Sequence, residues 1–249
     1  MADVVSGTFF PGEVIVENGR IAAIECVSSA EDRYILPGLI DAHVHIESSM
    51  LLPSEFARLA VVHGTTATVS DPHEIANVLG MEGVKFMIRN GKKVPFRFFF
   101  GAPSCVPATG FETSGAYLGP AEVEEMLSWP EIRYLAEMMN FPGVLHQDGE
   151  VMAKLAAAAK YKKTVDGHAP GVLGEDARRY AAAGISTDHE CFTREEALDK
   201  IRAGMKVLIR EGSAARNFDE LIGLIEDYPE MIMFCSDDKI GRASCRERV

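Results

Sequence analysis

His43 and His45 are the residues whose type and spacing most clearly suggest chemistry in this chain. They stand two positions apart at the end of an apolar run, and alternate side chains of an extended chain lie on one face. Two imidazoles aimed at one point can bind a divalent metal ion. The pair alone fits two incidental surface histidines equally well, so the interpretation depends on the residues that accompany it.

Further residues with metal-binding side chains end other apolar runs. His168 closes the run TVDGH and His189 closes ISTDH, while Glu137 and Asp237 add carboxylates at the ends of two more. Imidazole favours zinc, iron, nickel or copper, whereas carboxylates favour harder ions such as manganese. The mixed set therefore predicts a metal site and leaves the choice of metal open.

Weaker candidates follow two of the remaining runs. Five residues are candidate substrate contacts by position alone: His73, Glu74, Arg210, Glu211 and Ser213. Structural roles compete with this interpretation, because Asp71 can cap a helix that has Pro72 in its first turn, and an Arg-Glu pair can be structural.

Acidic neighbours of the proposed ligands leave two questions open. Asp238 adjoins Asp237, and the two aspartates could exchange roles. Asp188 and Glu190 flank His189, and we expect them to orient it or to face solvent.

The elements that must position these residues alternate between strands and helices. Eight runs are expected strands, at 35–46, 65–71, 96–103, 132–139, 164–169, 185–190, 206–213 and 231–238. Eight strands can close a (β/α)₈ barrel, although an open doubly wound sheet would show the same alternation. Polar residues gather at the carboxyl ends of at least six runs, where barrel enzymes build their sites. The predicted fold is therefore α/β, a TIM-type barrel.

Local signals mark where the expected helices begin and end. Gly64, Gly184 and Gly204 stand where a helix would end before the next strand, and glycine readily adopts the left-handed conformation of that position. Thr193 and Glu196 have the spacing of a capping box that opens a helix.

The ends of the chain differ from this pattern. Residues 13–26 alternate apolar and polar around Asn18-Gly19, which predicts a β-hairpin. We expect a partial small β-domain at 1–35 and a barrel at 36–239 whose last helix is missing, leaving apolar barrel surface uncovered. Residues 240–249, IGRASCRERV, resemble a translated sequencing adapter and are expected to be an artefact.

Composition excludes some partners. A net charge of −12 over 249 residues argues against a nucleic-acid binder, which needs clustered basic residues. The chain has no apolar stretch long enough for a membrane span and no signal-peptide pattern at its start. Its 5 cysteines are odd in number and form no C-x-x-C pair, which favours a reducing cytoplasm.

Longer motifs add a family resemblance. The run LPGLIDAHVHIESSM resembles the opening strand of the amidohydrolase superfamily, and SDPHEIANVLG, GAPSCVPATG, LAEMMNFPGV, VDGHAPG and FCSDDK together resemble the adenine deaminase family within it. The resemblance implies that His43, His45 and Asp237 hold one metal ion and that His168 and His189 hold a second. Many relatives bridge the two ions with a carboxylated lysine, where this chain has Glu137 as adenine deaminases do.

The same resemblance implies a reaction. A metal-bridged hydroxide would attack C6 of adenine, with Asp237 and Glu137 as catalytic residues, to give hypoxanthine and ammonia in purine salvage. It further implies two divalent ions, manganese first with iron or zinc as alternatives, and a homo-oligomer for the parent protein. The alternatives are another amidohydrolase, such as a cyclic amidase or a different deaminase, and a non-catalytic truncated barrel.

Overall fold

The computed structural model describes residues 1–239, so the artefact proposed for residues 240–249 lies outside the described residues. The chain divides into two compact units, Met1–Leu39 and the part from Ile40 onward. No helix among the described residues is long and apolar enough to cross a membrane.

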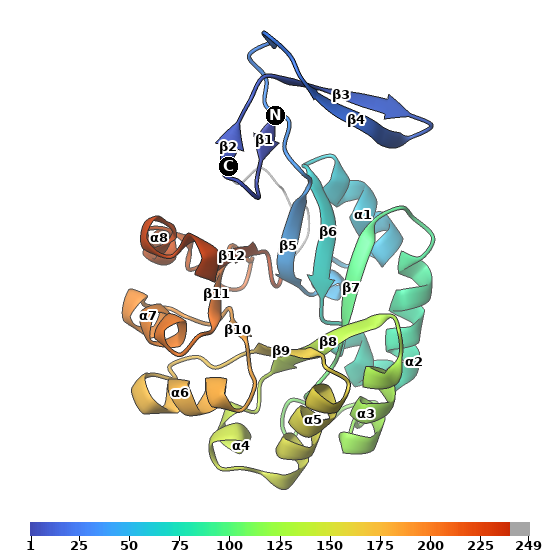
Figure 1. Cartoon of the computed structure of the whole chain (residues 1–249). Coiled ribbons are helices and arrows are strands. Elements are labelled where there is room, and N and C mark those ends of the chain that lie inside the picture. The colour runs from blue at the N-terminus through green and yellow to red at the C-terminus, as the bar shows by residue number, and fades with distance from the viewer. Residues whose placement is uncertain (240–249) are drawn as a thin grey trace. The chain divides into compact units, whose positions relative to one another are not determined.

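The first unit consists of two short antiparallel pairs. Strands β1 (Ala2–Asp3) and β2 (Thr8–Phe9) pair with each other, and β3 (Gly12–Glu17) pairs with β4 (Arg20–Cys26). The β3–β4 turn is the expected Asn18-Gly19 dipeptide, with positive φ angles of 51° and 72° at the two residues. These angles suit asparagine and glycine in a tight hairpin turn. The predicted hairpin is therefore present (Figure 1).

Up to residue 239 the second unit contains eight strands, one within each predicted run, the first of which begins at Leu39, the last residue of the first unit. They are β5 (Leu39–Val44), β6 (Thr65–Ser70), β7 (Arg97–Ala102), β8 (Ile132–Met138), β9 (Thr164–Gly167), β10 (Thr187–Asp188), β11 (Lys206–Arg210) and β12 (Ile232–Cys235). Strands β5 to β9 form one sheet in sequence order, and β10 to β12 form another. The registers from β6 to β9 and from β10 to β12 are parallel.

Two parallel bridges join these sheets into a ring. Val165 bridges Ile185 at one seam, and Val44 bridges Asp237 at the other. At the second seam the amide of Asp237 donates to the carbonyl of His43 at 2.9 Å. An open doubly wound sheet would keep two unpaired edges, so the closed ring supports the TIM-type barrel. The closing seam lies among the predicted metal ligands themselves.

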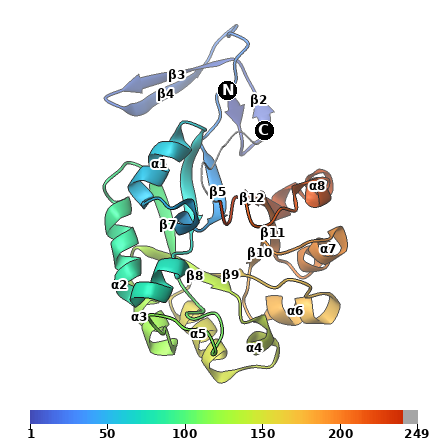
Figure 2. The same cartoon turned by 180° about the vertical axis from the view of Figure 1, so that it is seen from behind.

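Helices alternate with the strands and lie around the outside of the ring (Figure 2). They are α1 (Pro53–Val61), α2 (His73–Gly91), α3 (Pro120–Ser128), α4 (Phe141–Leu145), α5 (Gly149–Lys160), α6 (Gly174–Ala182), α7 (Arg194–Arg202), α8 (Phe218–Leu221) and α9 (Leu224–Asp227), with 3₁₀ turns at Ile46–Ser49 and Pro229–Met231. One apolar cluster joins β5, β7, β8 and β9 with the helices from α1 to α6, and a smaller one joins β11 with α7, α8 and α9.

The helix boundaries confirm some of the local signals and correct others. Gly64, Gly184 and Gly204 all have positive φ, as expected for glycines that follow helices. Thr193 caps α7, because its Oγ1 accepts the Glu196 amide at 3.2 Å. The capping box is nevertheless only half formed, since the Glu196 carboxylate accepts amides from two loops instead.

The helix after β6 begins differently from the alternative considered for Asp71. The N-cap position of α2 is Pro72, and no side chain caps it. The Asp71 carboxylate instead lies 3.0 Å from Nδ1 of His73. Pairing with a histidine therefore replaces helix capping as the contact of this aspartate.

Candidate metal centre

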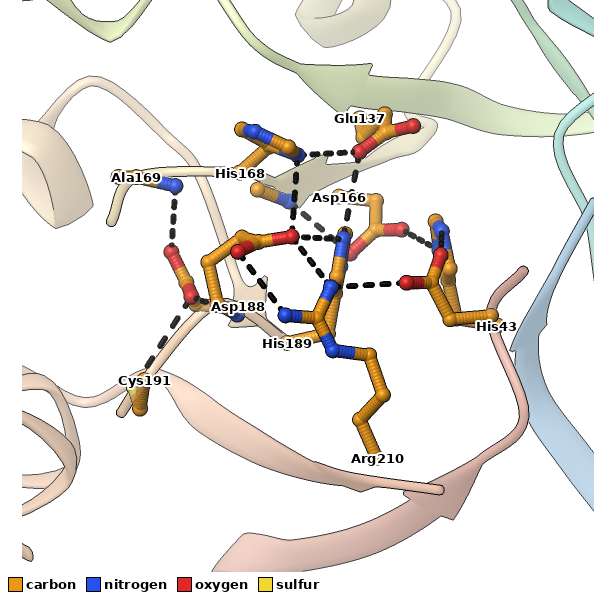
Figure 3. A network of polar contacts seen from close by, with 12 residues as sticks. His43, Glu137, Asp166, His168, Ala169, Asp188, His189, Cys191 and Arg210 are labelled. Carbon is orange, nitrogen blue, oxygen red and sulfur yellow. Dashed lines mark hydrogen bonds and ion pairs between the residues drawn. The ribbon is translucent and has the colours of Figure 1, made fainter. Parts of the chain in front are cut away.

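The barrel brings all six predicted metal ligands to one place at the carboxyl ends of its strands. His43 and His45 come from the end of β5, Glu137 from β8, His168 and His189 from directly after β9 and β10, and Asp237 from after β12. Several of these side chains converge in Figure 3. Five of the six residues are at most 4% exposed, whereas the side chain of His168 is 27% exposed. The cluster is therefore buried except at His168.

His43 in β5 and His45 just after it turn the same ring nitrogen toward each other. Nδ1 of His43 donates to Oδ2 of Asp166 at 2.7 Å, and Nδ1 of His45 donates to the carbonyl of Asp71 at 3.1 Å. Each ring therefore presents Nε2, and the two Nε2 atoms lie 3.1 Å apart. Two imidazole lone pairs at this separation repel unless a proton or a cation lies between them. Oδ1 of Asp237 lies 3.3 Å from Nε2 of His45 and 3.6 Å from that of His43.

Glu137 lies between two groups of histidines. Its Oε1 is 3.2 Å from Nε2 of His45 and 3.2 Å from Nδ1 of His73. Its Oε2 is 2.7 Å from Nδ1 of His168 and 3.3 Å from Nε2 of His189. Each carboxylate oxygen thus faces a different pair of nitrogens, so Glu137 could contact a cation on either side.

The electrostatics of the cluster also suit divalent cations. Burial favours the neutral form of Glu137, but hydrogen bonds from His168, His189 and His45 hold its pKa well below its usual range. Burial likewise opposes charge on His43, yet Asp166 outweighs it and raises the pKa of His43 to about 9. The carboxylates remain charged and draw protons onto the imidazoles. A divalent cation would supply the same positive charge to the same oxygens, so the donor set fits metal ions.

The spacing of donor atoms defines overlapping groups that could hold an ion. Among the described residues these groups are His43, His45 and Asp237; His43, Glu137 and His189; His168, His189 and Glu190; and His45, Asp71, His73 and Glu137. The first group is the set predicted for one ion. Glu190 joins the predicted second pair, His168 and His189, whereas Asp71 and His73 group with His45 and Glu137.

Arg210, a candidate substrate contact by its position, is paired with two carboxylates. It is 3% exposed, and its guanidinium donates to both carboxylate oxygens of Glu190 and to Oδ2 of Asp237 at 2.7 Å. Glu190 is accordingly paired with an arginine rather than facing solvent. Arg210 therefore holds two acidic side chains at the edge of the cluster.

The remaining substrate candidates lie outside the ligand groups, apart from His73. Glu74 accepts a hydrogen bond from Ser48 at 2.8 Å, and the same hydroxyl contacts Asp238. Asp238 is thus turned toward Ser48 while Asp237 faces the histidines, which separates the two aspartates geometrically. Glu211 and Ser213 follow β11, where their amides donate to the carbonyls of Cys235 and Asp238.

Asp166 belongs to the same network but is not among the residues predicted for the site. Its Oδ1 accepts the amide of Gly167 at 2.9 Å and the hydroxyl of Thr187 at 2.5 Å, while its Oδ2 receives the imidazole of His43. Burial raises the pKa of this carboxyl, but the charge of His43 outweighs burial and lowers it overall. Asp166 precedes His168 by two positions on β9, so the two-residue period that identified His43 and His45 could have found it.

Replacing Asp166 with asparagine should weaken metal binding by about 10- to 100-fold, as loss of an outer partner of a ligand histidine typically does. An amide accepts the His43 proton less strongly and has no charge to fix its tautomer. Equilibrium titration with Mn²⁺ would measure the change. Thr187→Val removes only the hydroxyl that supports Asp166, and should have a smaller effect. Equal affinities in wild type and Asp166→Asn would contradict this role.

Comparisons with known proteins show the family of this chain. Residues 34–235 match the amidohydrolase family. Curated adenine deaminases are similar in sequence: that of Sulfurovum sp. (strain NBC37-1) is 58% identical over 247 residues, and that of Salinibacter ruber is 59% identical over 239. These matches cover 99% and 96% of this chain but 46% and 44% of the relatives. The chain thus spans less than half the length of the curated relatives it matches.

Solved structures show the same fold at low sequence identity. N-acetyl-D-glucosamine-6-phosphate deacetylase from Mycobacterium smegmatis aligns with a TM-score of 0.57 at 16% identity, over 90% of this chain and 66% of that one. An atrazine chlorohydrolase variant from Arthrobacter aurescens TC1, solved with zinc and atraton, aligns with a TM-score of 0.57 at 16% identity, over 91% and 67%. The match of residues 34–235 to the family model shows that the chain belongs to the amidohydrolase family.

Proposed function

We propose that this chain carries the metal centre of an adenine aminohydrolase, which converts adenine and water to hypoxanthine and ammonia. The observation that carries the proposal is the 58% identity to an adenine deaminase across 99% of this chain, a span that includes every residue of the cluster. Glu137 between the two groups of histidines is consistent with it, because other subfamilies place a carboxylated lysine there.

The residues of the cluster would hold two divalent ions. His43, His45 and Asp237 would bind one, His168 and His189 the other, and Glu137 would contact both. When bound, such ions lower the pKa of water toward neutrality and so supply a nucleophile at physiological pH. Manganese is our first choice because two of the six donors are carboxylates, and iron or zinc would also suit the four imidazoles.

Asp237 is the residue we assign to proton transfer. Its Oδ2 is held by Arg210 at 2.7 Å, so Oδ1 is the oxygen that faces the histidines. Oδ1 would take a proton from the attacking water and pass it to the amino group on C6 of adenine. The C6–O bond forms, the C6–N bond breaks, and the nitrogen leaves as ammonia.

The same proposal covers the substrate, the pathway and the oligomeric state of the whole protein. A small molecule, adenine, is the substrate, and the reaction belongs to purine salvage in the cytoplasm. We further propose that the parent protein is a homo-oligomer. His73 and Glu74 on α2, together with the residues that follow β11, remain the proposed substrate contacts.

A substrate comparison tests the proposal. The metal-loaded protein should release ammonia from adenine and should show much weaker or no hydrolysis of guanine, cytosine and dihydroorotate. Preference for one of the other compounds would favour the alternative of a different amidohydrolase. Stoichiometric metal binding without turnover of any of them would favour a non-catalytic barrel.

A further inference from the structure

Lys200 is a fully buried lysine that takes no part in the proposed chemistry. Lys200 on α7 is 0% exposed, as is Asp188 at the end of β10, and Glu196 is 4% exposed. The Lys200 ammonium lies 3.2 Å from Oδ2 of Asp188 and 2.9 Å from Oε1 of Glu196, and donates to the carbonyl of Ala169 at 2.7 Å. Its three N–H groups therefore have three buried oxygen partners.

The two carboxylates of this group reach two different loops. Asp188 accepts the amide of Ala169 at 2.9 Å and that of Glu190 at 2.7 Å. Glu196 accepts the amide of Gly171 at 2.8 Å and that of Phe192 at 3.1 Å. Each carboxylate thus bonds one amide from the loop after β9 and one from the loop after β10. Figure 3 shows Asp188 directed at Ala169 in this way.

These two loops carry the histidines proposed for the second ion. His168 directly precedes Ala169, and His189 lies between Asp188 and Glu190. His168 is also the most exposed of the six proposed ligands, so packing around its ring constrains it less than the others. Apart from the contact of its Nδ1 with Oε2 of Glu137 at 2.7 Å, its position depends on its backbone. Tyr180 contributes on one side, because its hydroxyl accepts the His168 amide at 3.1 Å and donates to Met138 at 2.8 Å.

We propose that Lys200 is a positioning residue that, through Asp188 and Glu196, sets the distance between His168 and His189 and thereby the affinity of the second metal site. The inference rests on the proposed metal centre. Burial opposes charge on Lys200, but Asp188 and Glu196 raise its pKa above its usual value, so the ammonium stays charged. Without it, two buried carboxylates would repel each other, and the loops they hold would separate.

The test compares Lys200→Met with Ile201→Ala, a matched control on the same helix. Ile201 is 8% exposed and belongs to the apolar cluster around β11, so its truncation destabilises the fold without removing the buried ion pairs. Two properties are measured: amide hydrogen exchange of segments 168–172 and 189–193 in the metal-free protein, and Mn²⁺ affinity by calorimetric titration. Lys200→Met should speed amide exchange in both segments and weaken binding of the second ion by at least about tenfold. Lys200→Arg should restore part of the protection from exchange and part of the affinity.

If Lys200→Met matches Ile201→Ala in both exchange and Mn²⁺ affinity, the positioning role is wrong. If the wild-type protein binds no Mn²⁺, the proposed metal centre is wrong. If amide exchange in Lys200→Met is unchanged, Lys200 does not hold the two loops together, whatever the metal affinity. Should Lys200→Met fail to fold, Glu196→Gln takes its place. This variant keeps the size of the side chain, and exchange should then rise at Gly171 and Phe192, whereas unchanged exchange would contradict the proposal.

Discussion

Replacing Asp237 with asparagine is expected to slow adenine deamination by about 10²- to 10⁴-fold while most of the bound metal stays in place. An asparagine amide keeps an oxygen that can face the ligand histidines, but it cannot take a proton from water and pass it to the departing amine. Steady-state rates of ammonia release, together with metal content per chain, would measure both effects.

Asp238→Asn is the matched control for this prediction. The Asp238 side chain contacts Ser48, whereas that of Asp237 lies 3.3 Å from His45. We therefore expect a much smaller loss of rate when Asp238 is changed. Full activity in Asp237→Asn, or a larger loss in Asp238→Asn, would show that proton transfer has been assigned to the wrong residue.

Glu137→Gln is expected to weaken binding of both ions by more than about 100-fold, because loss of an outer partner alone costs about 10- to 100-fold. Either orientation of the glutamine amide would place its NH₂ group against one pair of nitrogens. One pair includes His45 at 3.2 Å and the other includes His189 at 3.3 Å. The substitution also removes the negative charge that the two ions would share. Metal content after dialysis against a chelator of known affinity would measure the loss.

The control for Glu137→Gln is Glu74→Gln. Glu74 accepts a hydrogen bond from Ser48 and is absent from the groups of described residues that could hold an ion. Its substitution should leave metal content unchanged. If Glu137→Gln lost only one ion, Glu137 would be a ligand of a single site rather than the residue shared by both.

Much of the fold could be predicted because its signals are local. A strand alternates its side chains with a period of two, so His43 and His45 had to share a face. A strand of a parallel barrel ends at the rim where sites form, so Glu137 and His189 could be assigned to one rim from their positions in their runs. The Asn18-Gly19 turn and the glycines that follow helices depend on backbone angles that few other residues adopt.

The features that were missed depend on contacts between distant segments. Asp166 meets His43 across 123 positions of sequence, and Arg210 meets Asp237 across 27. The two-residue period on β9 marks Asp166 as a candidate, but no local pattern pairs it with His43 or pairs Arg210 with Asp237. Glu196 was predicted to close a capping box, but buried amides from two loops and the Lys200 ammonium compete for its carboxylate. Buried donors that water cannot reach need a hydrogen-bond acceptor within the protein, so these tertiary contacts override the local capping box.

We propose that this cluster is a two-ion centre for adenine deamination. A direct test is to titrate the metal-free protein with Mn²⁺ while recording both the equivalents bound and the hypoxanthine formed from adenine. We expect activity to be absent without metal and to reach its maximum at two equivalents per chain, with hypoxanthine and ammonia formed in equal amounts. Saturation at two equivalents with no hypoxanthine from a folded protein would contradict the function, and activity without metal would contradict the centre.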